Sequence, residues 1–124
     1  MRLRLLVSLG ALALVGLAGC SSSSSASGDA PFKVSGAPVQ TDHVELAKTY
    51  KFSPAVIEVK SGTTVTWTNR DDFPHNVTLM TGPDKTSKSL AIGEVASIPF
   101  NQPGTVYYQC TLHPQQMRGK VIVT

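Results

Sequence analysis

The pattern of hydrophobic residues constrains the fold of this chain more than any other feature of its sequence. Between residues 39 and 124, short β-branched or apolar runs are separated by turn residues at intervals of about 8 to 12 positions. Within residues 63–69, Thr63, Val65 and Trp67 alternate with other residues, as in a half-buried strand. This series predicts an all-β, Greek-key sandwich of about seven to eight strands.

Turn-forming pairs divide this region into individual strands. Ser61-Gly62, Phe73-Pro74, Gly82-Pro83 and Pro103-Gly104 mark turns or loops. A short helical turn within residues 84–91 is also compatible with the sequence. The expected strands are residues 44–52, 56–60, 63–69, 75–80, 94–100, 106–110 and 120–123, around a core that contains Phe52, Trp67, Phe100 and Tyr108.

The first 37 residues differ in character from the rest of the chain. Residues 1–19 combine arginines, a short apolar run and small residues before Cys20, which is the layout of a secretory signal peptide. The run Leu17-Ala18-Gly19-Cys20 resembles a bacterial lipobox, which implies cleavage before Cys20 and a lipid on its sulfur. The alternative is a soluble secretory signal followed by a chance cysteine. Residues 20–37 are expected to form a flexible tether, and residues 38–124 the folded domain.

Charge and cysteine content narrow the function further. Of the 11 Lys and Arg residues, Arg2 and Arg4 leave with the signal peptide, so nine remain against eight acidic residues. A nearly neutral chain without a basic cluster is not expected to bind nucleic acid. If Cys20 is acylated, Cys110 is the only free thiol of an exported protein, where unpaired cysteines are unusual. That thiol needs an explanation.

A thiolate, an imidazole and a thioether lie close together near the C-terminus, in Cys110, His113 and Met117. Soft sulfur ligands favour copper(I), imidazole binds both copper(I) and copper(II), and two His, one Cys and a distant Met form a blue-copper site. His75 follows a predicted strand and a Pro-containing turn and supplies the second imidazole, whereas His43 is expected to be a solvated surface residue. We therefore predict that His75, Cys110, His113 and Met117 bind one copper ion that cycles between Cu(I) and Cu(II).

Each of these residues has a simpler interpretation when it is taken alone. Cys110 can be a buried thiol, because Val106, Tyr108 and Cys110 share one face of their strand. His113 can be a loop residue, and Met117 can fill the core. Zinc is disfavoured because a thioether is a poor zinc ligand and structural zinc sites use several cysteines. A dinuclear copper site would need a second cysteine in the loop.

The domain resembles the cupredoxins, and within them the plastocyanin and amicyanin-like group. The resemblance covers nearly all of residues 44–124 and includes both predicted ligand segments in the family's order. The matching segments are Tyr50-Lys51-Phe52-Ser53-Pro54 with residues 56–60, Val65-Thr66-Trp67-Thr68-Asn69 with Pro74-His75-Asn76-Val77, Pro103-Gly104-Thr105-Val106-Tyr107-Tyr108-Gln109-Cys110, and His113-Pro114 through Met117-Arg118-Gly119-Lys120-Val121.

The resemblance implies a role for each of these site residues. His75, Cys110 and His113 would be equatorial ligands and Met117 the weak axial ligand, while Asn76 would brace the ligand loop by hydrogen bonding. Electrons would pass through His113 within an apolar patch that includes Phe73, Pro74 and Pro114. Three residues separate His113 from Met117, a spacing intermediate between those of amicyanin-like proteins and plastocyanins. The length of the axial bond to Met117 therefore cannot be inferred from either group.

We expect an electron-transfer protein rather than an enzyme, because four protein ligands leave no open position for a substrate. The expected partners are redox proteins such as a cytochrome, oxidase, dehydrogenase or reductase. The protein would be a monomer, held by the lipid on Cys20 at the periplasmic or cell-surface side of a membrane. A copper delivery, buffering or tolerance protein of the cell envelope is the alternative.

Overall fold

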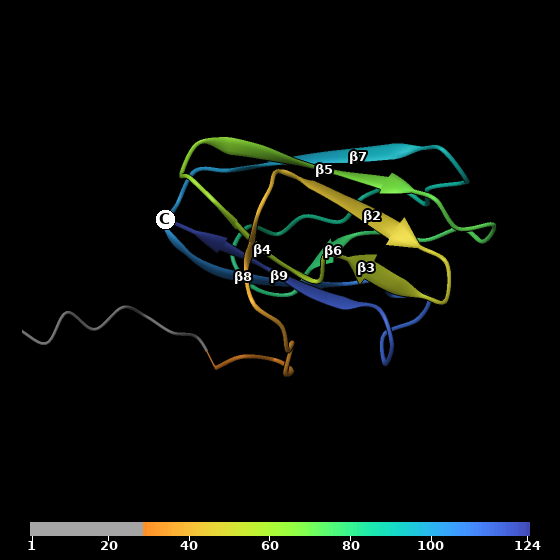
Figure 1. Ribbon diagram of the computed structural model, residues 1–124, viewed down its shortest axis with the longest axis horizontal. Helices are drawn as coiled ribbons and strands as arrows, with labels where there is room; N and C mark the ends of the chain where they lie inside the picture. Colours follow the sequence, from red (N-terminus) through yellow and green to blue (C-terminus); the bar gives the residue numbers. More distant parts are fainter. Residues whose placement is uncertain (1–28) are drawn as a thin grey trace, which may run out of the picture.

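The computed structural model describes residues 29–124. The expected signal peptide, the expected lipidation site Cys20 and the first part of the expected tether lie outside the described residues. In the described part, nine strands form two sheets with the orders β1-β4-β9-β8-β6 and β3-β2-β5-β7 (Figure 1). The predicted all-β sandwich is confirmed. The strands are β1 (Val39–Gln40), β2 (His43–Ala47), β3 (Lys51–Ser53), β4 (Val56–Val59), β5 (Thr63–Asn69), β6 (Thr78–Leu79), β7 (Val95–Phe100), β8 (Gly104–Gln109) and β9 (Arg118–Val123).

Both sheets mix parallel and antiparallel pairs. In one, β5 lies parallel to β2 and antiparallel to β7. In the other, β9 lies parallel to β4 and antiparallel to β8. Inward and outward residues alternate along β8 as the sequence predicted, with Val106 and Tyr108 buried and Thr105 exposed. Because side chains alternate with a period of two, one face of each sheet packs against the core.

The expected strand at residues 44–52 is interrupted by a tight turn. β2 ends at Ala47, β3 begins at Lys51, and the two strands pair antiparallel. Between them, Thr49 and Tyr50 adopt left-handed conformations, with φ of 70° and 58°. Such values are uncommon for residues other than glycine. The sequence at this point contains no Gly, Asn or Asp from which the left-handed turn could be predicted.

The expected strand at residues 75–80 is reduced to the short β6. The amide and carbonyl of His75 instead bond to the carbonyl and amide of Leu90, at 3.1 and 2.7 Å. The amide of Ser87 likewise donates to the carbonyl of Val77 at 2.8 Å. Residues 84–91 therefore lie extended beside residues 75–78 and not in the helical turn that we considered. Within residues 29–124 there is no helix, and hence none long and apolar enough to cross a membrane.

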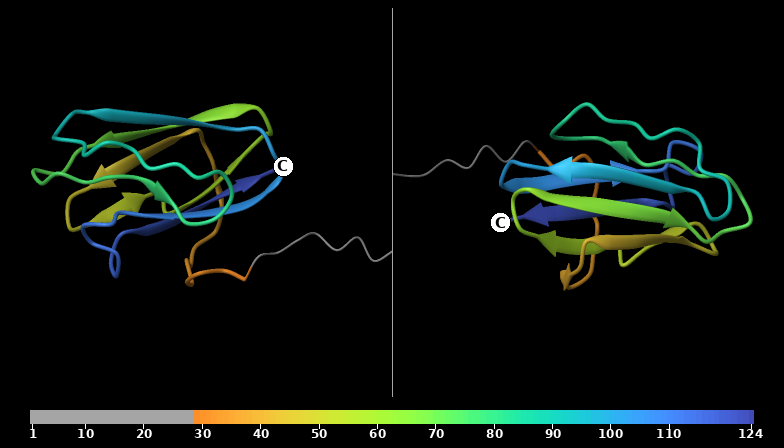
Figure 2. Two further views of the ribbon diagram at one scale, coloured as in Figure 1. Left: turned by 180° about the vertical axis from the view of Figure 1, so that it is seen from behind. Right: turned by 90° about the horizontal axis from the view of Figure 1, so that it is seen from above.

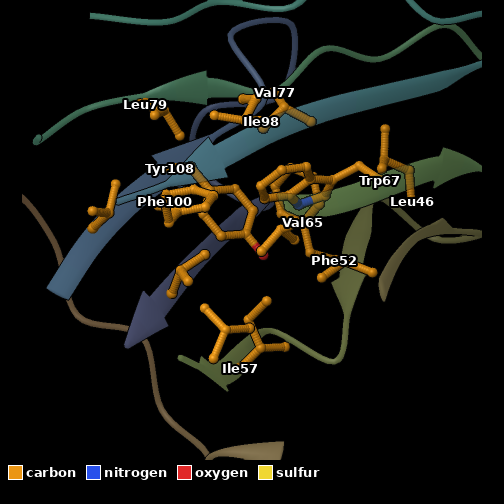
Figure 3. Packing of buried hydrophobic residues seen from close by; sticks show 14 of the residues in the cluster. Leu46, Phe52, Ile57, Val65, Trp67, Val77, Leu79, Ile98, Phe100 and Tyr108 are labelled. Carbon is orange, nitrogen blue, oxygen red and sulfur yellow. The ribbon is translucent and has the colours of Figure 1, made fainter. Parts of the chain in front are cut away.

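The core lies between the two sheets and is centred on aromatic side chains (Figure 3). The ring of Tyr108 lies 4.8 Å from that of Phe52 and 5.2 Å from that of Trp67, and the Trp67 and Phe100 rings are 6.1 Å apart. All four are buried, as predicted. Glycine is required at position 119, because a Cβ there would overlap the Tyr108 ring.

Candidate metal centre

Two loops carry the four predicted ligands, and both emerge at the end of the sandwich opposite the C-terminus (Figures 1 and 2). The first follows β5 and contains His75. The second connects β8 to β9 and contains Cys110, His113 and Met117. Since β5 and β8 belong to different sheets, the site lies where the two layers of the sandwich meet.

The donor atoms of His75 and Cys110 are already adjacent. The distance from His75 Nδ1 to Cys110 Sγ is 3.8 Å, and both side chains are fully buried. The backbone amide of Asn76 donates to the same sulfur at 3.4 Å. A thiolate that accepts a backbone N–H bond keeps its other lone pairs free for a metal, and such bonds tune the metal it holds.

The other two predicted ligands are placed by turns within the second loop. The amides of Cys110 and Met117 donate to the carbonyls of Met117 and His113, respectively, each at 3.0 Å. Met117 is fully buried, whereas His113 is partly exposed with its ring centroid 5.2 Å from that of His75. Among residues 29–124, no three His, Cys, Asp or Glu side chains form a preformed metal cluster. The adjacent pair in this structure is therefore His75 and Cys110, and the roles of His113 and Met117 stay predictions.

The second ring nitrogen of His75 contacts a carboxylate. Its Nε2 lies 2.9 Å from Asp71 Oδ2, and Asp71 is buried as well. Because an ionised carboxylate can only accept, the proton of a neutral imidazole resides on Nε2, and the lone pair of Nδ1 points toward Cys110. This is the tautomer that a metal bound at Nδ1 requires. The donors present therefore fit a soft metal such as copper.

Asp71 remains ionised in this setting. Burial acts to raise the pKa of its carboxyl, but hydrogen bonds from His75 and from the Asp72 amide oppose it and hold the pKa below its usual value. The pair thus places a negative charge directly behind one predicted ligand. Sequence reasoning missed Asp71, although a carboxylate four residues before a predicted histidine ligand was a usable signal.

Asn76, the residue predicted to brace the ligand loop, connects the two loops through its side chain. Its Nδ2 donates to Thr111 Oγ1 at 2.7 Å, and its Oδ1 accepts from the Thr111 amide at 3.0 Å. With the bond from its own amide to the sulfur of Cys110, it contacts both the thiol and the residue that follows it.

Asn69 organises the first loop, and sequence reasoning missed it. This buried residue ends β5 and donates from Nδ2 to the carbonyls of Phe73 and Leu90, both at 2.8 Å. Its Oδ1 accepts from the Asp71 amide at 2.8 Å. An Asn side chain that bonds to nearby backbone is a usual means of shaping a turn. Here it fixes the carboxylate that meets His75.

Tyr50 is a third residue that sequence reasoning did not assign to the site. Its ring centroid lies 4.4 Å from that of His113, 5.8 Å from that of Phe73 and 5.9 Å from that of His75. The left-handed turn at Thr49 and Tyr50 directs this ring toward the loops. Nothing in the local sequence predicts that turn, so only the folded chain reveals the contact.

The predicted docking residues lie at the surface, and the Tyr50 ring contacts both Phe73 and His113. Phe73 is 54% exposed and Leu112, which we did not predict, is 52% exposed. Pro74 and Pro114 are also exposed. His43 is exposed at the start of β2, as expected, with its Nε2 3.4 Å from Thr68 Oγ1.

A β-sandwich that brings a thiolate, two imidazoles and a buried thioether to one end has the architecture of a mononuclear copper protein. Residues 39–124 match the family model described as copper binding proteins, plastocyanin/azurin family. The chain therefore belongs to this family. As the sequence predicted, it is a blue-copper electron-transfer protein that uses one copper ion.

Individual relatives agree with this assignment. The chain is 42% identical over 91 residues to amicyanin-alpha of Methylorubrum extorquens, covering 70% of this chain and 75% of that protein. It is 39% identical over 92 residues to amicyanin of Paracoccus denitrificans, covering 64% and 63% of the two chains.

Solved structures also resemble this chain. An oxidised amicyanin variant matches with 40% identity and a TM-score of 0.59, over 66% of this chain and 80% of that one. A purple cupredoxin from Nitrosopumilus maritimus matches with 29% identity and a TM-score of 0.60, over 66% and 98%. A copper-containing nitrite reductase from Thermus scotoductus matches with 30% identity and a TM-score of 0.60, over 73% of this chain but only 23% of the reductase.

Proposed function

We propose that this protein is a membrane-anchored carrier that exchanges electrons with redox proteins through the end of the sandwich that carries His113. The difference in exposure among the four predicted ligands is the observation that carries this proposal. His75, Cys110 and Met117 are fully buried, whereas His113 is partly exposed. A bound copper ion would supply a one-electron Cu(I)/Cu(II) couple. The imidazole of His113 is then the direct connection between the buried donors and a partner.

The surface around His113 supports docking by apolar contact. Phe73 and Leu112 are each about half exposed, and Pro74 and Pro114 lie beside them. Redox partners form small and short-lived interfaces, for which such a rim is sufficient. The near-neutral charge of the chain without residues 1–19 argues against strong electrostatic steering. A cytochrome, oxidase, dehydrogenase or reductase of the same compartment would be the partner.

The docking surface can be tested with a matched pair of charge substitutions. Leu112→Lys places a charge in the rim, and Val39→Lys places the same charge on β1, where the apolar side chain is similarly exposed. We expect the first variant to slow electron exchange with a reduced c-type cytochrome about tenfold, equivalent to about 1.4 kcal/mol of lost docking, and the second to leave it unchanged. Wild-type exchange by the Leu112→Lys variant would contradict docking at this end.

Colour and redox cycling separate the carrier from the alternative of copper delivery. The protein loaded with copper(II) should be intensely blue, and Cys110→Ala should be colourless because it lacks the thiolate. A carrier should be reduced and reoxidised repeatedly while it keeps its copper. Release of copper(I) to an acceptor protein without redox turnover would favour delivery or buffering instead.

The anchor rests on the lipobox-like run that ends at Cys20. A lipid on this residue would hold the domain at the extracytoplasmic side of a membrane, and acyl chains bind bilayers by burying their methylenes. Cells that express the full chain and are fed a labelled fatty acid should incorporate the label into the wild type but not into Cys20→Ser. Recovery of unlabelled wild-type protein in the soluble fraction would contradict the anchor.

A further inference from the structure

The segment that precedes β1 lies on the outer face of the larger sheet, below β8 and β9 in Figure 1. Phe32 makes the principal aromatic contact of this segment. Its ring meets that of Tyr107 edge to face, with centroids 5.7 Å apart and planes at 88°. Phe32 belongs to the stretch that the sequence assigned to the tether, yet it is only partly exposed. Phe32 therefore packs against the folded domain.

The same phenylalanine contacts Arg118, the first residue of β9. The guanidinium carbon of Arg118 lies 4.7 Å from the centroid of the Phe32 ring. From the same side chain, Nε donates to the carbonyl of Pro114 at 2.7 Å. Pro114 directly follows His113, and Arg118 directly follows Met117. One side chain therefore links the residues that adjoin two of the predicted ligands.

The two contacts of Arg118 depend on each other physically. A free arginine side chain loses rotamer entropy when it is held in one geometry. A ring stacked on the guanidinium restricts these rotamers and contributes about 0.5 to 1 kcal/mol at an exposed site. Phe32 thereby favours the rotamer in which Nε reaches Pro114. Lysine cannot replace this arrangement, because it has neither the planar face nor a donor at the Nε position.

We propose that Phe32 and Arg118 are a positioning pair for the metal-binding loop. Phe32 holds the guanidinium of Arg118, and Arg118 holds the carbonyl of Pro114, so that the loop between His113 and Met117 keeps its shape. Residues before the first strand then control how tightly the loop retains copper. This proposal uses the copper binding of the family and is independent of the anchor on Cys20 and of the docking partner.

The test is the rate at which copper(II) leaves the purified full chain for a chelator, followed by the loss of the blue colour. We expect Phe32→Leu to release copper about two- to fivefold faster, the factor that corresponds to the loss of one exposed cation–π contact. Phe32→Tyr keeps the aromatic face and should retain the wild-type rate. Arg118→Lys should release copper at least as fast as Phe32→Leu.

A double variant and a control distinguish positioning from general destabilisation. If Phe32 acts through Arg118, the Phe32→Leu and Arg118→Lys double variant releases copper no faster than Arg118→Lys alone. Val34→Ala shortens a partly buried side chain in the same segment and should leave the release rate unchanged. The free energy of unfolding of the copper-free protein is measured for every variant, and it should not follow the release rates. A wild-type release rate for Phe32→Leu, or independent effects of the two substitutions, would overturn the proposal.

Discussion

His75 shows how much of the site is decided by the partners of a single side chain. Its Nδ1 faces the sulfur of Cys110, and its Nε2 meets the carboxylate of Asp71. The carboxylate determines which nitrogen carries the proton, and therefore which one is free to bind a metal. Asp71 in turn is positioned by Asn69, whose side chain accepts from its amide. The tautomer of His75 thus depends on Asp71 directly and on Asn69 through Asp71.

The first prediction concerns this carboxylate. Asp71→Asn keeps the shape of the side chain but removes the negative charge behind His75. Copper affinity should fall about 10- to 100-fold, as for other residues that orient a metal-binding histidine. The reduction potential should rise, because a less negative environment favours copper(I) over copper(II). Competition with a chelator and voltammetry measure the two effects.

Asp72→Asn is the matched control for this substitution. Asp72 lies next in the chain but is exposed, and its carboxylate pairs at the surface with Lys48 at 3.3 Å. Removal of this charge should leave the affinity and the potential close to those of the wild type, because solvent screens it. Equal effects of the two substitutions would show that net charge, and not the contact with His75, sets the properties of the site.

At the scale of the element, loop residues do much of the positioning. Asn69 shapes the loop after β5, and Glu94 shapes the end of the segment that leads from β6 into β7. Glu94 was expected to begin a strand, but β7 begins at Val95. Its carboxylate instead accepts from the amide of Ala91 at 2.8 Å and from Lys88 Nζ at 2.9 Å. These bonds close a turn beside Leu90, whose backbone pairs with that of His75.

The second prediction is a pH dependence that belongs to this turn. The hydrogen bond from Lys88, and then that from the Ala91 amide, hold the pKa of Glu94 below its usual value. A lowered pKa means that the ionised carboxylate stabilises the fold above the ordinary glutamate pKa of about 4.3, and that this stabilisation is lost as the pH falls through the lowered pKa. Glu94→Gln should therefore lower the free energy of unfolding of the copper-free protein at neutral pH, with a difference that disappears in acid.

Denaturant titrations of the wild type and the variant across this pH range measure the difference. Glu58→Gln removes one carboxylate from β4 and serves as the control, with a smaller loss expected at neutral pH. A loss of stability in Glu94→Gln that persists unchanged in acid would contradict an electrostatic origin and would point to packing of the side chain.

At the scale of the whole molecule, the site joins the two layers of the sandwich. The loop that carries His75 leaves β5 of one sheet, and Cys110 follows β8 of the other. Between the sheets, the aromatic core holds the strand ends in place (Figure 3). Because an unfolded chain does not hold these ligands close together, metal binding favours the folded state.

The third prediction follows from this placement. At a free copper concentration about 1,000-fold above the dissociation constant, the metal should stabilise the folded protein by about 4 kcal/mol. Denaturation of the copper-free and the reduced copper-loaded protein, in the absence of oxygen, measures the difference. Cys110→Ser should show little of this gain because it lacks the thiolate. Equal midpoints for the two forms of the wild type would contradict a site that spans both sheets.

The sequence alone determined the all-β class, the aromatic core and the family, because residue alternation and the order of Cys110, His113 and Met117 are properties of the linear chain. Only the tertiary structure revealed the contacts of Asp71, Tyr50 and Phe32. The Tyr50 contact depends on a left-handed turn without a local signal, and the Phe32 contact brings together segments far apart in the chain. Local patterns report which face of a strand is buried, whereas the partner of a loop side chain is decided by how the two sheets pack.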